Sequence, residues 1–378
     1  MTAEIVFWSA LAFVAYAYVG YPMLLRLLLL FRDRPVGRAP VVPTVSFVIA
    51  AYNEGRSIAE KLENTLAIDY PRDALEVIVA SDHSTDETDA VVRSFSARGV
   101  RLLRTRMRGG KEAAQRHAVE CSSGDILVFS DVATRLLPDG VRRIVSSFAD
   151  PTVGCVSSVD RVVDGGGKAG GEGAYVRYEM WLRDLETRVN TLVGLSGSFF
   201  AARRAVCEAW RTDLQSDFNT LLNAVRLGLR GVSDPEAVAF YGSLRDARRE
   251  YDRKVRTVLR GITVVLRSLP LLNPCRYGLF AWQLLSHKLC RWLVPLALIV
   301  ALASHLALAA RSGAYAVALA VHLAFYIAAG VGLALLGREL PRALVVPSYF
   351  VLVNASILHA WGRYLAGERL VVWSPSQR

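Results

Sequence analysis

The stretch Glu76–Thr88, with the sequence EVIVASDHSTDET, decides how the first half of the chain folds. Its apolar run Val77–Ala80 is typical of a short buried strand, and the Ser, Asp and Thr residues of the following turn can hydrogen-bond their own backbone. In an open α/β sheet, ligands bind outside the carboxyl ends of the strands. Asp82 and Asp86 are therefore placed where a carboxylate can bind a ribose hydroxyl or a base. Alternatively, the turn is solvated and caps the next helix, with Thr85 or Asp86 as the N-cap.

The surrounding sequence repeats this strand-and-turn pattern. Apolar runs that predict strands lie at 45–50, 77–80, 100–103 and 126–129, and helical patterns lie between them, up to 66, at 88–98 and at 111–120. This alternation predicts an α/β fold with a mostly parallel sheet covered on both faces. Further along, 164–173 is glycine-rich and predicts a loop, and 172–193 and 218–227 predict helices.

The apolar residues are unevenly distributed. They make up 53% of the 378 residues, above the usual share for a soluble domain. Uncharged stretches lie at 5–25, 292–310, 312–337 and 343–362, and each approaches or exceeds the ~18–20 residues that span a bilayer. The first stretch is too long, and lacks the basic start, for a cleaved signal peptide. We therefore predict an integral membrane protein with one globular domain.

Charge predicts how the domain is oriented. Arg32, Arg34 and Arg38 follow the first apolar stretch, which favours a cytoplasmic domain. Three later spans would leave the tail outside, yet its arginines favour the inside. We therefore expect one of the last segments to be re-entrant or to lie along the interface. The predicted division is a transmembrane helix at 1–31, a globular domain at 40–244, a basic interfacial segment at 245–290, transmembrane helices at 291–362 and a tail at 363–378.

The basic segment suggests anionic partners. Residues 245–267 carry eight Arg or Lys side chains, which fits an amphipathic helix at a membrane surface; a solvated basic helix is the alternative. The net charge of +11 fits anionic lipid and an anionic substrate without nucleic acid. The five cysteines show no C-x-x-C spacing and are expected to be reduced structural thiols.

Three carboxylates lie at the end of a predicted element or just before the start of one: Asp82, Asp131 and Asp217. Such a set suits a nucleotide-sugar substrate, because sugar hydroxyls need acceptors and a diphosphate needs a cation. Mg²⁺ or Mn²⁺ takes oxygen ligands and bridges phosphates. A further carboxylate can act as general base on an acceptor hydroxyl.

Six short motifs, in this order, carry a family resemblance. They are VSFVIAAYNE (45–54), VASDHSTDET (79–88), RGGKEAA (108–114), FSDVATRLLPDG (129–140), GSFFAARR (197–204) and SDF (216–218). Over about 44–260 the chain resembles the family 2 inverting glycosyltransferases, and its membrane layout resembles the branch that builds cell-surface polysaccharides or glycolipids. The resemblance implies a Rossmann-like GT-A domain, cytoplasmic and joined to α-helical transmembrane segments, in a bacterial inner or plasma membrane.

The resemblance also implies roles for individual residues. Asp217 matches the catalytic base, Asp131 the first aspartate of the metal-binding D-x-D motif, and Ser196 and Gly197 the acceptor side. The donor-binding set is Ala51, Tyr52, Glu54, Asp82, Arg108, Lys111, Asp131 and Arg256. The implied cofactor is Mg²⁺ or Mn²⁺. The implied partners are a nucleotide-diphospho-sugar, expected to be a UDP-sugar, a lipid-linked or membrane-tethered acceptor, the lipid bilayer and other polysaccharide-assembly proteins, with no nucleic acid.

Several positions depart from the family pattern. Ala133 stands where the second Asp of D-x-D is expected, which weakens the expected metal site. Ser216 replaces an acidic residue before Asp217, and Arg116 stands where Asn is common. Thr257 replaces a tryptophan, which weakens the case for a processive polymerase. His83 replaces a glycine, a change expected to affect only the turn.

Other interpretations remain open. Lys111 could be a solvated lysine, Asp131 a cap of its turn and Arg256 part of a plain basic face. Ala133 and Ser216 support a degenerate, non-catalytic partner that binds a nucleotide sugar or regulates a synthase. A transporter with a sensory domain is the second rival, and charge-free spans argue against it. A glycosidase is disfavoured, because no close pair of acid and nucleophile carboxylates is evident.

Overall fold

The computed structural model describes residues 2–163, 171–242, 247–335 and 341–370. The chain forms two compact units. One, here called the sheet unit, comprises Arg32–Gly166, Glu186–Ser243 and Leu370–Arg378. The other, here called the membrane unit, comprises Met1–Phe31, Gly167–Leu185 and Leu244–Arg369. Each unit is described by itself.

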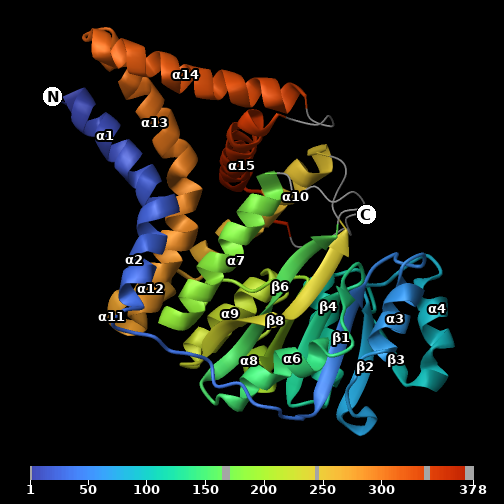
Figure 1. Ribbon diagram of the computed structural model, residues 1–378. Helices are drawn as coiled ribbons and strands as arrows, with labels where there is room; N and C mark the ends of the chain where they lie inside the picture. The colour runs from blue at the N-terminus through green and yellow to red at the C-terminus, as the bar shows by residue number, and fades with distance from the viewer. Residues whose placement is uncertain (1, 164–170, 243–246, 336–340, 371–378) are drawn as a thin grey trace. The chain divides into compact units, whose positions relative to one another are not determined.

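The sheet unit is built on one eight-stranded sheet, ordered β3-β2-β1-β4-β7-β6-β8-β5. The first four strands in space, β3, β2, β1 and β4, are parallel, as the repeated strand-and-turn pattern predicted, whereas β7 runs antiparallel to β4 and to β6. The fold is therefore α/β with a mixed sheet (Figure 1). The strands are β1 Val45–Ala51, β2 Leu75–Ser81, β3 Val100–Arg104, β4 Ile126–Asp131, β5 Arg135–Leu136, β6 Val153–Val163, β7 Phe199–Arg203 and β8 Arg230–Gly242.

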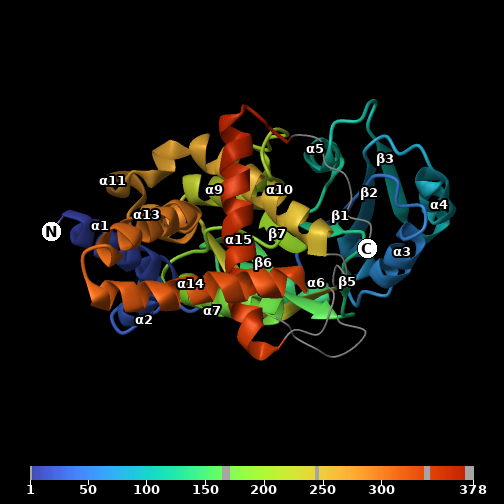
Figure 2. The same cartoon turned by 90° about the horizontal axis from the view of Figure 1, so that it is seen from above.

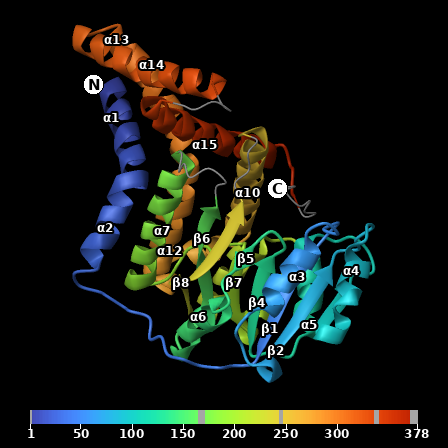
Figure 3. The same ribbon diagram turned by 45° about the vertical axis from the view of Figure 1, so that its right-hand side comes forward.

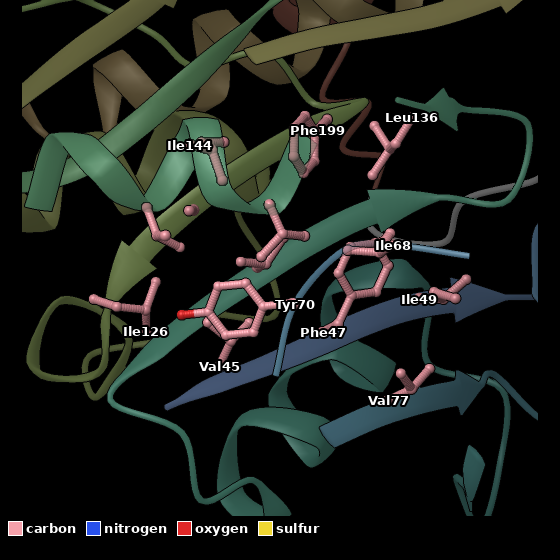
Figure 4. Close-up of a cluster of buried hydrophobic side chains, with 14 of the residues drawn as sticks. Val45, Phe47, Ile49, Ile68, Tyr70, Val77, Ile126, Leu136, Ile144 and Phe199 are labelled. Carbon is pink, nitrogen blue, oxygen red and sulfur yellow. The ribbon is translucent and has the colours of Figure 1, made fainter. Parts of the chain in front are cut away.

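Helices cover both faces of this sheet. All seven residues of β1 are buried, because successive side chains of a strand point to opposite faces. Val45, Phe47 and Ile49 pack into the cluster drawn in Figure 4, with side chains of α3, α4 and α6, whereas Val48 packs with α5, α8 and α9. These helices are α3 Ile58–Leu66, α4 Thr88–Ser94, α5 Lys111–Cys121, α6 Gly140–Ser146, α8 Arg204–Cys207 and α9 Ser216–Arg226, with short 3₁₀ turns at Arg72–Ala74, Ser96–Arg98 and Ser147–Ala149.

The membrane unit contains four helices long and apolar enough to cross a membrane: Thr2–Leu28, Leu279–Ala309, Gly313–Ala334 and Ala343–Leu365. The four apolar stretches of the sequence are thus confirmed as candidate spans. The labelled elements are α1 Thr2–Ala15, η1 Tyr16–Gly20, α2 Tyr21–Leu28, α7 Gly171–Val189 (whose end lies in the sheet unit), α10 Ala247–Leu266, η5 Leu269–Leu272, α11 Pro274–Tyr277, α12 Leu279–Leu284, η6 Leu285–Cys290, α13 Arg291–Ala309, α14 Gly313–Ala334 and α15 Arg342–Leu365.

The second candidate span differs from its predicted boundary. It begins at Leu279, not near 292, so it contains His287, Lys288 and Arg291. Charged groups that the sequence analysis placed before the span therefore lie within this helix. Arg291 Nη1 donates to Glu179 Oε2 of α7 at 2.8 Å, so its charge is paired. Of the predicted glycine-rich loop, 164–170 falls outside the described residues, and α7 begins at Gly171.

The spans of the membrane unit do not all run along one direction. α1 and α13 lie side by side (Figures 1 and 3), with Phe7 and Ala10 packed against Ala301 and Leu308. α14 and α15 instead cross one another (Figure 2), and Ser348 Oγ donates to the carbonyl oxygen of Ala329 at their contact.

Candidate active site at the carboxyl ends of the parallel strands

The parallel register brings the predicted site residues to one edge of the sheet. Ala50 of β1 lies opposite both Ala80 of β2 and Asp131 of β4. The residues that follow these strands, among them Tyr52 and Asp82, therefore emerge together. This confirms the geometric expectation drawn from the Glu76–Thr88 stretch.

The loops after β1 and β2 are locked to each other. The backbone N–H of Thr85 donates to Asn53 Oδ1 at 2.8 Å, and the N–H of Glu54 donates to Thr88 Oγ1 at 2.8 Å. Asp86 accepts from the N–H groups of Gly55 and Thr88, each at 3.0 Å. The alternative that Thr85 or Asp86 is the N-cap is wrong, because Glu87 stands at the N-cap of α4; the Asp86 carboxylate instead ties the two loops together through backbone N–H groups.

Two loop residues adopt the left-handed region. Asn53 has a φ of 51° and His83 a φ of 57°. Asn tolerates this conformation better than most residues, and glycine is favoured there. The departure at His83 therefore falls in a tight turn, as expected.

Asp82 is buried and holds the loop that begins α5. Its side-chain oxygens accept the backbone N–H groups of Gly109 and Gly110, each at 2.8 Å. These bonds position Arg108, whose guanidinium lies 4.0 Å from the centroid of the Tyr52 ring. Arg108 and Tyr52, which are both expected to bind the donor, are thereby stacked on each other. Asp82 holds the loop that carries Arg108.

The centre of the site joins Lys111 to two aspartates. Lys111, at the start of α5, is buried and forms an ion pair with Asp131 at the end of β4. Its Nζ also donates to the carbonyl oxygen of Gly197 at 3.3 Å. Burial alone would lower the pKa of Lys111, but Asp131, Glu112 and Asp217 raise it. The solvated-lysine interpretation of Lys111 is therefore wrong.

Asp217 lies in the first turn of α9, against the turn that contains Gly197. A Cβ atom built on Gly197 would lie 2.9 Å from Asp217 Oδ2, so only glycine lets the two approach this closely. Asp217 Oδ2 accepts from Gln215 Nε2 at 3.1 Å, and Oδ1 accepts from the N–H of Phe218 at 2.9 Å. The structure thus gathers Lys111, Asp131, Asp217 and Gly197 into one cluster.

The serines next to Gly197 bind a carboxylate that sequence reasoning missed. Ser196 Oγ donates to Asp160 of β6 at 2.7 Å, and Ser198 Oγ donates to Asp160 Oδ1 at 2.6 Å. The N–H of Asp131 donates to the carbonyl oxygen of Ser198 at 3.0 Å. The 196–198 turn therefore links Asp160 to Asp131. Because Asp160 lies within a long strand and outside the quoted motifs, no sequence signal marked it.

Lys61 of α3 is a second residue that the sequence analysis missed. Its Nζ is buried and donates to Ser130 Oγ and to the carbonyl oxygen of Thr134, both at 2.7 Å. Burial lowers the pKa of Lys61 to about 7, with Asp131 opposing the shift. Lys61 thus stabilises the turn that carries Asp131. In the sequence, Lys61 lies in an ordinary amphipathic helical pattern, and nothing in that pattern marks it as a site residue.

Glu54 lies close to the same aspartate. Burial, together with the charges of Asp131 and Asp86, raises the pKa of Glu54 to about 7. Among the described residues, no group of three His, Cys, Asp or Glu side chains is arranged to hold a metal ion. Mg²⁺ is commonly held by one or two carboxylates together with substrate phosphates. Asp131 and Glu54 fit that limited donor set, and Ala133 removes the usual second aspartate.

Arg256 belongs to the other unit. It lies on α10, half-buried, and burial together with Arg260 and Arg253 lowers its pKa. The expected role in holding a diphosphate therefore remains a prediction for Arg256. Its neighbours Arg253 and Lys254 line a cavity of the membrane unit.

Part of the chain is similar in sequence to known proteins. Residues 46–211 match the model of glycosyl transferase family 2. The chain is 34% identical over 221 residues to glycosyltransferase AglD of Haloferax volcanii, covering 53% of this chain and 35% of that protein. It is 32% identical over 118 residues to a beta-monoglucosyldiacylglycerol synthase of Synechocystis sp., covering 30% of this chain and 25% of that protein. The chain thus spans between a quarter and about a third of these relatives.

A solved structure shares the whole fold. The mannosyltransferase PcManGT of Pyrobaculum calidifontis, in complex with GDP-Man and Mn²⁺, superposes with a TM-score of 0.77 at 24% identity, covering 97% of this chain and all of that one. At this identity the likeness concerns the fold, including the helices outside the sheet unit. The stretch that carries Asp82, Lys111 and Asp131 is similar to glycosyl transferase family 2, whose model matches residues 46–211.

Proposed function

We propose that this protein is a membrane-bound, inverting glycosyltransferase. It would transfer a hexose from a nucleotide-diphospho-sugar to a lipid-linked or membrane-tethered glycan acceptor in cell-surface polysaccharide or glycolipid synthesis. The observation that carries the proposal is the convergence of Lys111, Asp131 and Asp217 at Gly197. The relatives named as a glycosyltransferase and as a glycolipid synthase support the same class of reaction.

The proposed reaction is a single displacement. The acceptor hydroxyl oxygen attacks the anomeric carbon, the bond to the diphosphate breaks, and the hydroxyl proton passes to Asp217 as general base. Lys111 supplies a positive charge next to Asp131, on the side of the site where the donor would bind. Arg108 and Tyr52 would bind the nucleoside diphosphate, with Asp82 holding their loop. Holding both substrates in one geometry supplies much of the rate gain.

We propose that Asp131 and Glu54 are the residues of this chain that would hold a divalent ion. Asp131, with Glu54 nearby, would hold Mg²⁺ or Mn²⁺ together with the diphosphate. When bound, the ion neutralises charge on the leaving diphosphate. The structure of PcManGT contains Mn²⁺, which supports including both metals in the test.

The first test is a panel of nucleotide-diphospho-sugars offered to the full-length protein in detergent, with and without Mn²⁺ or Mg²⁺. We expect a UDP-sugar to be used, and GDP-sugars belong in the panel because PcManGT was solved with GDP-Man. Asp217→Asn should abolish transfer while retaining donor binding, and Asp131→Ala should weaken metal-dependent binding. Asp73→Asn, an exposed carboxylate before β2, is the matched control.

The outcomes separate the proposal from its rival. Turnover that survives Asp217→Asn would contradict the role of Asp217. Donor binding without turnover, even with membrane lipid extract added, would favour the degenerate partner that Ala133 and Ser216 suggested. The proposed placement is an inner or plasma membrane of a bacterium, with the sheet unit in the cytoplasm.

A further inference from the structure

A carboxylate on β6 lies beside the turn that leads into β7. The pairing of β6 with β7 ends at Ser157, opposite Phe200, and β6 continues along β8, where Asp160 lies opposite Ala239. Asp160 is half-buried, and its side chain contacts the turn 196–198. Because pairing with β8 fixes the backbone of β6 here, the Asp160 carboxylate occupies a defined position next to this turn.

The turn is bound to β6 by both side chains and backbone. Ser196 Oγ lies 2.7 Å from each oxygen of the Asp160 carboxylate, and Ser198 Oγ donates to Asp160 Oδ1 at 2.6 Å. The backbone N–H of Ser196 also donates to Ser157 Oγ at 2.7 Å. Hydrogen bonds to an ionised carboxylate are stronger than those between neutral groups. Asp160 therefore restrains both serine side chains of the turn.

The same turn contacts the three groups on which the proposed reaction depends. The carbonyl oxygen of Gly197 accepts from Lys111 Nζ at 3.3 Å, and that of Ser198 accepts from the backbone N–H of Asp131 at 3.0 Å. A Cβ atom at Gly197 would lie 2.9 Å from Asp217 Oδ2. A shift of this turn therefore changes the position of Asp217 relative to Lys111 and Asp131.

The two sides of the site depend on the turn to different degrees. Lys111 and Asp131 also restrain each other through their ion pair, and Asp131 is the last residue of β4. Asp217 lies on a separate element, α9, and meets this pair across Gly197. Loosening the turn should therefore disturb the alignment of Asp217 more than the donor side itself.

We propose that Asp160 is a positioning residue for the transfer reaction. Acting through the hydroxyls of Ser196 and Ser198, it fixes the turn that aligns Asp217 with Lys111 and Asp131. Asp160 itself takes no proton and touches no substrate in this role. The inference rests on the proposed function, because it concerns how the residues of that reaction are aligned.

The first test is steady-state kinetics of Asp160→Ala and Asp160→Asn in the full-length protein in detergent. For Asp160→Ala we expect kcat to fall on the order of 10²-fold, while the KM for the donor changes by less than about three-fold, because alignment rather than donor binding is lost. Asp160→Asn keeps one acceptor oxygen and should lose about ten-fold in kcat. A kcat unchanged in Asp160→Ala would overturn the inference.

The serines show whether Asp160 acts through them. The double variant Ser196→Ala/Ser198→Ala should lose as much kcat as Asp160→Ala. Adding Asp160→Ala to that double variant should cause no further loss, because residues that act through one contact are not additive. If Asp160→Ala still causes its full loss without the two hydroxyls, Asp160 contacts the substrate directly and the inference is wrong.

Asp150→Ala is the matched control. Asp150 is another half-buried carboxylate, which lies before the start of β6 and accepts from the Thr152 hydroxyl at 2.7 Å. We expect this variant to keep its kcat, and thermal melting of all variants establishes that they are folded. A loss of kcat in Asp150→Ala equal to that in Asp160→Ala would attribute the effect to general destabilisation and contradict the inference.

Labelling of Lys111 tests the same inference without any donor. Lys111 is buried against the turn, so acetic anhydride followed by mass spectrometry should modify it several-fold faster in Asp160→Ala than in the wild type. Lys61, also buried but bound to Ser130 and Thr134, is the internal reference and should not change. An unchanged rate at Lys111, or an equal rise at Lys61, would refute the inference. If no donor is turned over but Lys111 responds as expected, only the proposed function is contradicted.

Discussion

At the scale of single residues, the contact between Gly197 and Asp217 sets the active-site geometry. A side chain at 197 would meet the Asp217 carboxylate at 2.9 Å. Because the carboxylate is the end of a side chain, it can move aside without disturbing the fold. The contact therefore matters for chemistry more than for stability.

This predicts a specific outcome for Gly197→Ala. The variant should fold and bind donor, but its kcat should fall on the order of 10²-fold, because a displaced base loses its alignment with the acceptor. Gly140→Ala is the control, since a Cβ there meets only Leu136 Cβ at 3.6 Å. Steady-state kinetics of both variants test this, and full activity in Gly197→Ala would contradict it.

Glu54 predicts a pH dependence of stability. Its pKa is about 7 in the folded protein, above the ordinary value of 4.5, so the folded state binds the proton more tightly. The free energy of unfolding should therefore decline as pH rises from about 4.5 to 7 through this group. Glu54→Gln should remove that part of the decline.

Chemical denaturation of the wild type and Glu54→Gln at pH 5 and pH 8 measures the difference. The free energy of unfolding of Glu54→Gln, minus that of the wild type, should be larger at pH 8 than at pH 5. Parallel pH profiles for the two proteins would show that Glu54 does not titrate in this range.

At the scale of elements, the turn between β4 and β5 depends on a lysine from α3. Lys61 Nζ holds Ser130 Oγ and the Thr134 carbonyl, one on each side of Asp131. Lys61→Met would leave both oxygens without this donor, at a cost of about 1–3 kcal/mol. It should also weaken donor binding, because the position of Asp131 is no longer fixed.

Arg135→Gln provides the comparison for this prediction. Arg135, the first residue of β5, forms an exposed ion pair with Glu60 of α3, and exposed pairs contribute about 0–1 kcal/mol. Unfolding free energies and donor affinity of the two variants can be measured side by side. A Lys61→Met protein as stable and as tight-binding as Arg135→Gln would refute the supporting role of Lys61.

At the scale of the whole molecule, the course of the chain through the membrane is the main prediction. Positive charges follow the first span at Arg32 and Arg34, and flank the end of the last at Arg363 and Arg369. The positive-inside tendency places both regions in the cytoplasm. The crossing of α14 and α15 (Figure 2) accommodates a last segment that lies along the interface.

Cysteine labelling tests this topology. Cys121 and Cys275 are the exposed free cysteines, so a Cys275→Ser background leaves Cys121 as a reporter of the sheet unit. Ala366→Cys, made with Cys121→Ser as well, reports the chain after α15. We expect an impermeant maleimide to label neither reporter in intact cells and both after permeabilisation. Labelling of Ala366→Cys alone in intact cells would place the tail outside.

Much of the site followed from local sequence. Asp82 and Asp131 each follow or end an apolar run, and a parallel strand that ends in a polar turn places its next residues at the ligand-binding edge. Lys111 and Asp217 came from motifs that resemble a known family. Lys61 and Asp160 were missed, because both act through contacts with distant residues that no local pattern records.

The sequence by itself determined the alternation of strands and helices, the apolar spans and the basic segment, since each depends on periodicity or composition over a few turns of chain. Only the tertiary structure decided that Asp82 serves the loop of Gly109 and Gly110, that Lys111 pairs with Asp131, and that Asp160 binds the hydroxyls of Ser196 and Ser198. These features join residues far apart in the chain, so their partners are fixed by packing and hydrogen-bond satisfaction rather than by spacing.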